Sequence, residues 1–387
     1  MVAYGAMKHS TERILTTHAG SLPRPDDLLD LIQTPGVDRG ARAARVRSAV
    51  ADIVRTQLDL GLDIVDDGEM SKPSFVTYVH ERLAGFEPSR ERAGLPWAGS
   101  REVLAFPAFY ASTSNAARIA TPLACTGPIR YVGHGAVRMD IANLQAALKG
   151  GGGTEAFLPA ISPSNIEGRY ANKHYPTEEA YLFAIADAMH EEYKAIVDAG
   201  VLLQIDDPRL VTYYIMQPQA SITECRRWAE VRVEALNHAL RGVPRDRVRF
   251  HTCYSINMGP RVHDMQLKDI VDVILQVRAG AYSFEAANPR HEHEWRVWEG
   301  MTLPDDAVLI PGVITQSTVL VEHPELVAER IMKFASVVGR ERVIAGADCG
   351  FATFAGSTEI HPSIAWAKLS ALVEGARLAS TRLWGRA

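Results

Sequence analysis

Short apolar runs alternate with longer amphipathic stretches along most of the chain. The runs are rich in Val, Ile and Leu and end at polar or turn-forming residues, which is typical of buried strands. The stretches between them carry the three-to-four-residue spacing of helices. Eight strand-like runs can be distinguished, at residues 14–18, 62–67, 117–125, 201–206, 247–253, 281–286, 307–313 and 342–348.

The intervening stretches predict helices, and several of them end in glycine, a common residue just past a helix. They cover residues 41–61, 178–200, 221–242, 265–280, 324–339 and 361–380. Because the strands are continuously apolar, we expect them to be buried on both faces of a parallel sheet. Eight alternating units predict an α/β fold of the (β/α)₈ TIM-barrel class. An open dinucleotide-binding sheet is disfavoured, because no Gly-x-Gly-x-x-Gly fingerprint follows the first strand.

Two stretches are longer than barrel loops need to be. Residues 70–116 carry aromatic and charged segments, and residues 127–176 include a run of four glycines at 150–153. We expect both to be insertions over the C-terminal face of the barrel. No internal repeat or linker indicates a second domain, so residues 1–387 are expected to form one elaborated barrel.

Composition narrows the functional classes. Of the 387 residues, 47% are hydrophobic and 22% charged, with a net charge of −5, so a large core can form. The charges are interleaved and form no basic stripe, which argues against nucleic-acid and membrane-surface partners. The N-terminus does not resemble a signal peptide, and four scattered cysteines do not make a disulfide scaffold. We therefore expect a cytoplasmic protein with reduced thiols.

His251 and Cys253 form the most informative pair of side chains. They end a strand-like run and are two residues apart, so the pleat points both side chains the same way. An imidazole and a thiolate on one face suit zinc, and Glu285 and Cys349 end two later runs in the same manner. The alternative is a core histidine beside a buried structural cysteine, and the convergence of four donors favours the metal site.

The other strand ends are also polar, which matters because TIM-barrel active sites lie there. Each of these residues has a structural alternative: Asp206 and Asp207 precede a proline and could open a turn, Glu69 could start a helix, and Ser21 could cap one. His291 and His293 are rival metal ligands, but their alternation with glutamates is typical of a charged helix start. The strand-end set is His18, Gly20, Ser21, Asp66, Asp67, Glu69, Cys125, Thr126, Gly127, Asp206, Asp207, Asn288 and Asp348.

The motifs resemble those of the catalytic half of cobalamin-independent methionine synthase and its single-barrel relatives, which include epoxyalkane:coenzyme M transferase. The resemblance spans nearly the whole chain, in the family's order. It rests on TTHAGSLPRP (16–25), DDGEMSKPSF (66–75), TGP (126–128), QIDDP (204–208), HTC (251–253), SFEAANPRHEHEW (283–295) and GADCGF (346–351).

The resemblance implies a zinc ion held by His251, Cys253, Glu285 and Cys349, and a thiol substrate that binds the metal as thiolate. Zinc deprotonates a coordinated thiol and so supplies a nucleophile at neutral pH. In the family the thiol is homocysteine. By resemblance, Gly20 and Ser21 would contact its carboxylate, and Glu69 and Asp206 its ammonium. Glu69 and Asp206 are therefore also the candidate catalytic residues.

Departures from the family pattern leave the methyl donor open between a methylfolate and a methylated corrinoid. Only one barrel is present, and VITQST (313–318) has Ser317 where the family carries a proton-donating histidine. Methyl transfer from a tertiary amine needs a protonated leaving nitrogen, whereas a corrinoid donor does not. The alternatives are thiol alkylation of the epoxyalkane:coenzyme M transferase type, with Arg261 or Arg290 binding the sulfonate, a zinc hydrolase, and a closed non-catalytic zinc site.

Overall fold

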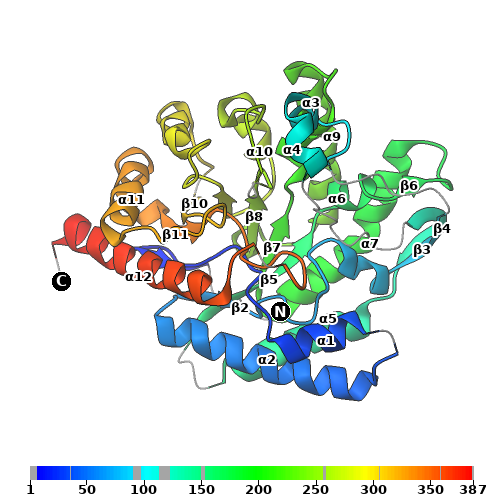
Figure 1. The fold of residues 1–387 in the computed structure, drawn as a ribbon, viewed down its shortest axis with the longest axis horizontal. Coiled ribbons are helices and arrows are strands. Elements are labelled where there is room, and N and C mark those ends of the chain that lie inside the picture. The colour runs from blue at the N-terminus through cyan, green and yellow to red at the C-terminus, as the bar shows by residue number, and fades with distance from the viewer. Residues whose placement is uncertain are drawn as a thin grey trace.

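The strands of the computed structural model form an eight-stranded sheet that curves into a nearly closed barrel (Figure 1). All neighbouring strands in it are parallel. In spatial order they are β1 (Leu15–Thr16), β11 (Ile344–Ala347), β10 (Val308–Ile314), β9 (Ala281–Phe284), β8 (Val248–Thr252), β7 (Leu202–Asp206), β5 (Glu155–Ile161) and β2 (Ile64–Asp66). The structure describes residues 7–34, 36–89, 97–112, 123–149, 153–255, 259–304, 306–357 and 359–385.

Several hydrogen bonds join the first and last strands of that order, β1 and β2, and two of them end on backbone carbonyls. The amide of Asp63 donates to the carbonyl of Thr16 (3.2 Å), and the Thr17 hydroxyl donates to the carbonyl of Ile64 (3.0 Å). The predicted TIM-barrel class is confirmed.

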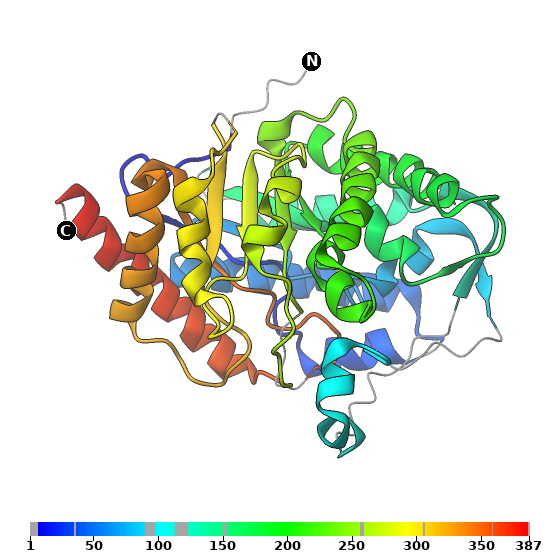
Figure 2. The same cartoon turned by 90° about the horizontal axis from the view of Figure 1, so that it is seen from above.

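Helices cover the outside of the barrel (Figures 1 and 2). Five of the six predicted helices are present within a few residues of their expected ends; 265–280 instead forms a short 3₁₀ turn (Leu267–Asp269) and the single turn of α10. The helices are α1 (Asp26–Gln33), α2 (Arg39–Leu60), α3 (Arg101–Ala105), α4 (Pro107–Ser112), α5 (His134–Ala147), α6 (Pro163–Glu167), α7 (Glu178–Asp198), α8 (Arg209–Met216), α9 (Ile222–Ala239), α10 (Val271–Ile274), α11 (Pro324–Val338) and α12 (Pro362–Trp384). Among the described residues, no helix combines the length and the apolar character needed to cross a bilayer.

The third barrel strand was predicted in the wrong place. Within the run 117–125, residues 117–122 lie outside the described part of the chain, and Leu123–Tyr131 forms β4 of a separate three-stranded sheet with β3 (Leu83–Pro88) and β6 (Ala171–Asn172). The true third strand is β5, inside the segment 127–176 that was expected to be an insertion. Pro159 lies in the middle of β5, and a proline normally argues against a central strand.

Side chains inside the barrel follow the two-residue period of the strands. An apolar layer fills one level, and it includes Ile64, Phe157, Leu202, Ala281, Val308 and Ile344. Two residues further along, the inward positions become polar: Asp66 on β2, Gln204 on β7 and Ser283 on β9 are all buried. The same parity carries Asp206 and Glu285 to the inside at the carboxyl end of the sheet. The strand pleat thus delivers these polar side chains to one end of the barrel.

Candidate metal centre and substrate site

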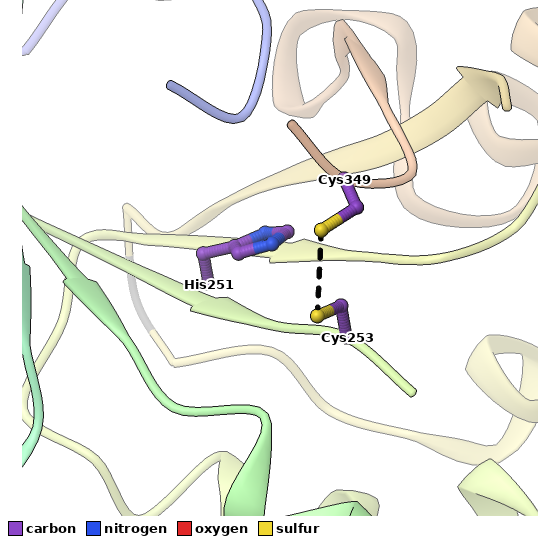
Figure 3. A group of neighbouring side chains, drawn as sticks. All are labelled: His251, Cys253 and Cys349. Carbon is purple, nitrogen blue, oxygen red and sulfur yellow. Dashed lines mark hydrogen bonds between the residues drawn. The ribbon is translucent and has the colours of Figure 1, made fainter. Parts of the chain in front are cut away.

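His251, Cys253 and Cys349 come together at the carboxyl ends of β8 and β11 (Figure 3). One ligand atom from each lies within 4.8 Å of the others, and all three side chains are buried. The Cys349 thiol donates a hydrogen bond to the Cys253 sulfur at 3.5 Å. The predicted alignment of His251 with Cys253 is confirmed, and the loop after β11 brings the second thiol to the pair.

These three side chains fit a zinc ion. Two sulfur atoms that each lie about 2.3 Å from a tetrahedral zinc are separated by about 3.8 Å, close to the distance found here. The Nε2 atom of His251 is buried without a hydrogen-bond partner in the described structure, whereas its Nδ1 lies 3.1 Å from the Ser283 hydroxyl. A metal-binding histidine usually has one ring nitrogen held by a hydrogen bond and the other ring nitrogen open to the metal.

The electrostatics of the two thiols favour one thiolate. The hydrogen bond from Cys349 lowers the pKa of Cys253 well below its ordinary value, and it raises the pKa of Cys349, which keeps its proton. Burial lowers the pKa of His251, but its closeness to the negatively charged Cys253 sulfur outweighs this effect and raises it. His251 and Cys349, which hold protons in this arrangement, must release them when a metal ion binds.

Glu285, the fourth predicted ligand, lies outside the group of atoms within 4.8 Å. One of its carboxylate oxygens accepts from the backbone amide of Tyr254 (2.7 Å), and the other accepts from the Asn288 side chain (2.8 Å). Burial and the charges of Cys253 and Asp348 raise its pKa. Glu285 is therefore close to the centre, and its ligation stays a prediction.

Asp348 holds the segment that follows Glu285. Its carboxylate accepts hydrogen bonds from the amides of Ala286 (2.7 Å) and Ala287 (2.8 Å) and from the Asn288 side chain (3.1 Å). Gly312 on β10 makes room for it, since a Cβ there would lie 2.1 Å from an Asp348 oxygen. These contacts join the ends of β9, β10 and β11 next to His251, Cys253 and Cys349, which are called the metal-binding group below because they could hold a metal ion.

We expect Asp348→Asn to weaken metal binding by about 10- to 100-fold while leaving the barrel folded. The asparagine could still accept from the two alanine amides, but its NH₂ group would face the NH₂ of Asn288, which positions Glu285. Competition with a chromophoric zinc chelator would measure the change. Unaltered affinity would show that the Asp348 contacts do not support the centre.

Glu69 and Gly20 meet on the neighbouring side of the barrel mouth. Glu69 has a left-handed backbone (φ 57°), which is uncommon outside glycine, and its amide donates to Asp67 (2.9 Å). A Cβ on Gly20 (φ 127°) would lie 3.0 Å from the Pro159 ring, 3.4 Å from Glu69 Oε1 and 3.6 Å from Asp66 Oδ2. The other oxygen of Glu69 is buried without a partner among the described residues. This open carboxylate is suited to bind a cation.

Ser21 connects this cluster to the metal-binding group. A Cβ on Gly350 would lie 2.0 Å from the Ser21 hydroxyl, so Ser21 packs directly against the residue after Cys349. The hydroxyl is buried and has no hydrogen-bond partner in the described structure. The structural alternative for Ser21, a helix cap, is not observed, because the first helix of that segment begins at Asp26 after Pro25.

Asp206 lies between the two clusters. It is paired in register with His251, and it accepts a hydrogen bond from Gln204 (2.9 Å). Burial raises its pKa to about 7; the charge of His251 opposes this shift and the charge of Glu69 adds to it. The structure therefore brings all the predicted substrate-site residues to the carboxyl end of the barrel.

The raised pKa of Asp206 predicts how the free energy of unfolding depends on pH. Between pH 3.8 and about 7 the unfolded chain ionises this carboxyl while the folded protein keeps it protonated, so stability falls as pH rises. Asp206→Asn removes that cost and should stabilise the metal-free protein at pH 8 by up to about 4 kcal/mol. Urea unfolding would measure it, with equal stability of both proteins expected near pH 3.5. A variant that is no more stable at pH 8 would contradict the assignment.

Three further buried side chains around the site were not singled out from the sequence. Ser283 contacts His251, Gln204 contacts Asp206, and Arg249 donates to Thr17 and His18. The inward parity of β7, β8 and β9 could have found them, because each lies two or four residues before a predicted site residue.

The two histidines that were alternative metal ligands, and the serine that departs from the family pattern, lie as follows. His293 is exposed, as expected, whereas His291 is buried away from the metal-binding group, hydrogen-bonded to Glu294 (2.8 Å) and stacked on Tyr254. Ser317, where the family has its histidine, is half-buried, and its hydroxyl lies 2.9 Å from that of Thr315. Neither histidine belongs to the group of metal-binding side chains.

The fold and the site define a (β/α)₈ barrel with an imidazole and two thiols gathered at its carboxyl end. Residues 168–374, more than half of the chain, match the family model for the catalytic domain of cobalamin-independent synthase. The chain therefore belongs to the cobalamin-independent methionine synthase family.

The relatives agree with this membership. A methionine synthase of Thermococcus kodakarensis is 26% identical over 95% of this chain and 94% of its own length. A 2-hydroxypropyl-CoM lyase of Xanthobacter autotrophicus is 24% identical over 87% of this chain and 86% of its own. The B12-independent methionine synthase of Shewanella sp. W3-18-1, solved with selenomethionine, has the same fold, with a TM-score of 0.73 and 20% identity over 97% of this chain and all of that one. These findings support an enzyme of the methyltransferase class related to methionine synthase.

Proposed function

We propose that the protein is a zinc-dependent thiol S-methyltransferase that acts on homocysteine. One observation carries the proposal: an imidazole and two thiols lie within 4.8 Å of one another, beside buried carboxylates with open oxygens. Zinc in this centre would be held by His251, Cys253, Cys349 and Glu285, and it would supply a thiolate nucleophile at neutral pH. The two thiols of the proposed centre suit a reducing cytoplasm.

The residues around the centre would orient the amino-acid part of the substrate. The ammonium group would bind the open oxygen of Glu69 and the carboxylate of Asp206. The α-carboxylate would accept hydrogen bonds from the Ser21 hydroxyl and the backbone at Gly20. Since Ser21 packs against Gly350, next to Cys349, these contacts would hold the sulfur of the substrate at the metal-binding group.

Thiol alkylation of the coenzyme M type is the second candidate, favoured by the similarity to the 2-hydroxypropyl-CoM lyase. Buried carboxylates argue against it, because Glu69 and Asp206 would repel a sulfonate placed in the same position. Of the two arginines considered for the sulfonate, Arg290 is already paired with Asp264 at 3.0 Å.

X-ray absorption at the zinc edge would test the proposal. Homocysteine should add one sulfur to the zinc shell, whereas homoserine, which has a hydroxyl in place of the thiol, should not. A new sulfur with coenzyme M but not with homocysteine would favour the second candidate. A shell that no thiol changes would indicate a closed structural site.

The methyl donor needs its own assay. The purified zinc protein would be given homocysteine with 5-methyltetrahydrofolate, with methylcobalamin, or with a small epoxide, and the thioether product would be measured. Because Ser317 replaces the family's acid, a corrinoid donor is the simpler expectation for this chain. Hydrolysis of an ester without any thiol consumption would instead support a zinc hydrolase.

A further inference from the structure

Arg261 has hydrogen-bonding capacity that the proposed reaction does not yet use. Its side chain is 8% exposed, and one terminal nitrogen, Nη2, donates to the carbonyl of Ser255. Its Nε and its other terminal nitrogen, Nη1, are buried without a partner in the described structure. Buried donors of a charged group are rarely left unsatisfied, so this guanidinium is poised for a ligand.

The guanidinium is held on both sides. It lies 4.3 Å from the centre of the Trp97 ring, on the segment that leads into α3. One oxygen of Glu102 on α3 accepts hydrogen bonds from the backbone amides of Val262 (2.9 Å) and His263 (2.8 Å), the two residues that follow Arg261. The loop that leaves the metal-binding strand β8 is thereby joined to α3, which projects with α4 from one end of the barrel (Figure 2).

Two other arginines already have acidic partners, whereas the buried Arg249 donates to Thr17 and His18. Arg290 binds Asp264, and Arg82 binds Asp140 and Glu192. Among the described residues, no carboxylate lies within 4.0 Å of the Arg261 guanidinium. Its positive charge nevertheless acts on the metal centre, because it opposes the rise in the pKa of Glu285.

We propose that Arg261 binds an oxyanion, a carboxylate or a sulfonate, on a substrate that enters beside the metal centre. The inference rests on the proposed function. It adds a second anion site to the one that Ser21 and Gly20 provide for the α-carboxylate of an amino-acid thiol. A planar guanidinium with two donors that no described residue occupies matches a planar or trigonal oxyanion, and stacking on Trp97 fixes its orientation. Two sources share this chemistry: the carboxylates of a methyl donor, and the acidic tail of a thiol.

Calorimetry on the zinc-loaded full chain would test the proposal with two matched pairs of probes. The donor pair is 5-methyltetrahydrofolate and 5,6-dimethyltetrahydropterin, which lacks the carboxylates. The thiol pair is coenzyme M and 2-mercaptoethanol, which lacks the sulfonate. We expect Arg261→Gln to bind the anionic member of one pair about 10- to 100-fold more weakly, with the neutral member unchanged. The affected pair identifies the source of the anion.

Arg290→Gln is the matched control, since Arg290 lies on a neighbouring loop and is already paired. It should bind all four probes like the parent protein. Arg261→Lys keeps the charge but loses the bidentate geometry, so we expect it to bind the anionic probe with intermediate affinity. If Arg261→Gln does not fold, Arg261→Lys replaces it in the test. Melting temperature and zinc content report on folding.

Two results would overturn the inference. One is a parent protein that shows no preference for the anionic member of either pair. The other is an Arg261→Gln variant that binds both anionic probes unchanged. Both results can be told apart from a failure of the proposed function, which is tested separately by the sulfur that homocysteine adds to zinc. A protein could pass that test and fail this one, or the reverse.

Discussion

Cys349→Ser is expected to remove most of the bound zinc from a barrel that stays folded. Structural zinc sites contribute about 10–16 kcal/mol through four ligands, so the loss of one thiolate should weaken binding by roughly 100-fold or more. A serine hydroxyl does not replace it, because the soft thiolate is the ligand that zinc prefers here. Zinc content after dialysis, with circular dichroism to check the fold, would measure the effect.

Cys125→Ser is the matched control for that variant. Cys125 is also buried, but it lies on β4 of the separate sheet, and its thiol donates to the carbonyl of Gly127 at 3.4 Å. Serine can make the same hydrogen bond, so zinc content should not change. Full zinc retention by Cys349→Ser would contradict the ligand set, and equal losses in both variants would point to a folding defect instead.

Glu69→Gln should lower kcat/KM for homocysteine by at least about 100-fold. The substitution keeps the shape of the side chain and removes the charge that would face the substrate ammonium, and losing one partner of a buried charged pair typically costs 2–5 kcal/mol. The left-handed turn should survive, because the backbone amide of Glu69, not its side chain, binds Asp67. Steady-state kinetics with a fixed methyl donor would measure the change.

A substrate without the amino group distinguishes a loss of ammonium binding from a general loss of activity in the Glu69→Gln variant. The parent protein should prefer homocysteine strongly over 4-mercaptobutyrate, which keeps the thiol and the carboxylate. In Glu69→Gln this preference should largely disappear, while the rate with 4-mercaptobutyrate stays close to that of the parent. If both substrates lose activity equally, Glu69 supports the site without contacting the ammonium.

The third barrel strand shows why local patterns were insufficient for part of the fold. The run 117–125 looks like a strand, and its last residues do form one, but in a separate small sheet. β5 contains Pro159 and follows a glycine run, so its local sequence reads as a loop. Its place between β2 and β7 is decided by long-range pairing, in which Ile64 aligns with Glu155 and Asp206 with Ile161. Tertiary pairing overrides local propensity here.

The sequence predicted one part of the metal-binding group, and the tertiary structure decided the other part. The spacing of His251 and Cys253 on one strand was enough to predict that they share a face, because the strand period is two residues. Cys349 does not follow that rule, since the inward position at the end of β11 is taken by Asp348. Only the turn into Gly350, packed against Ser21, explains how Cys349 reaches within 3.5 Å of Cys253.

The sequence by itself determined the fold class, the family and the identity of the side chains that gather at the carboxyl end of the barrel. These follow from short-range periodicity and from motifs, which are properties of neighbouring residues. The tertiary structure alone decided which donors lie within ligand distance and that Glu285 is held by Tyr254 and Asn288. It also decided that two donors of Arg261 have no partner in the described part of the chain. Such distances depend on contacts between residues far apart in the chain, and no local pattern contains them.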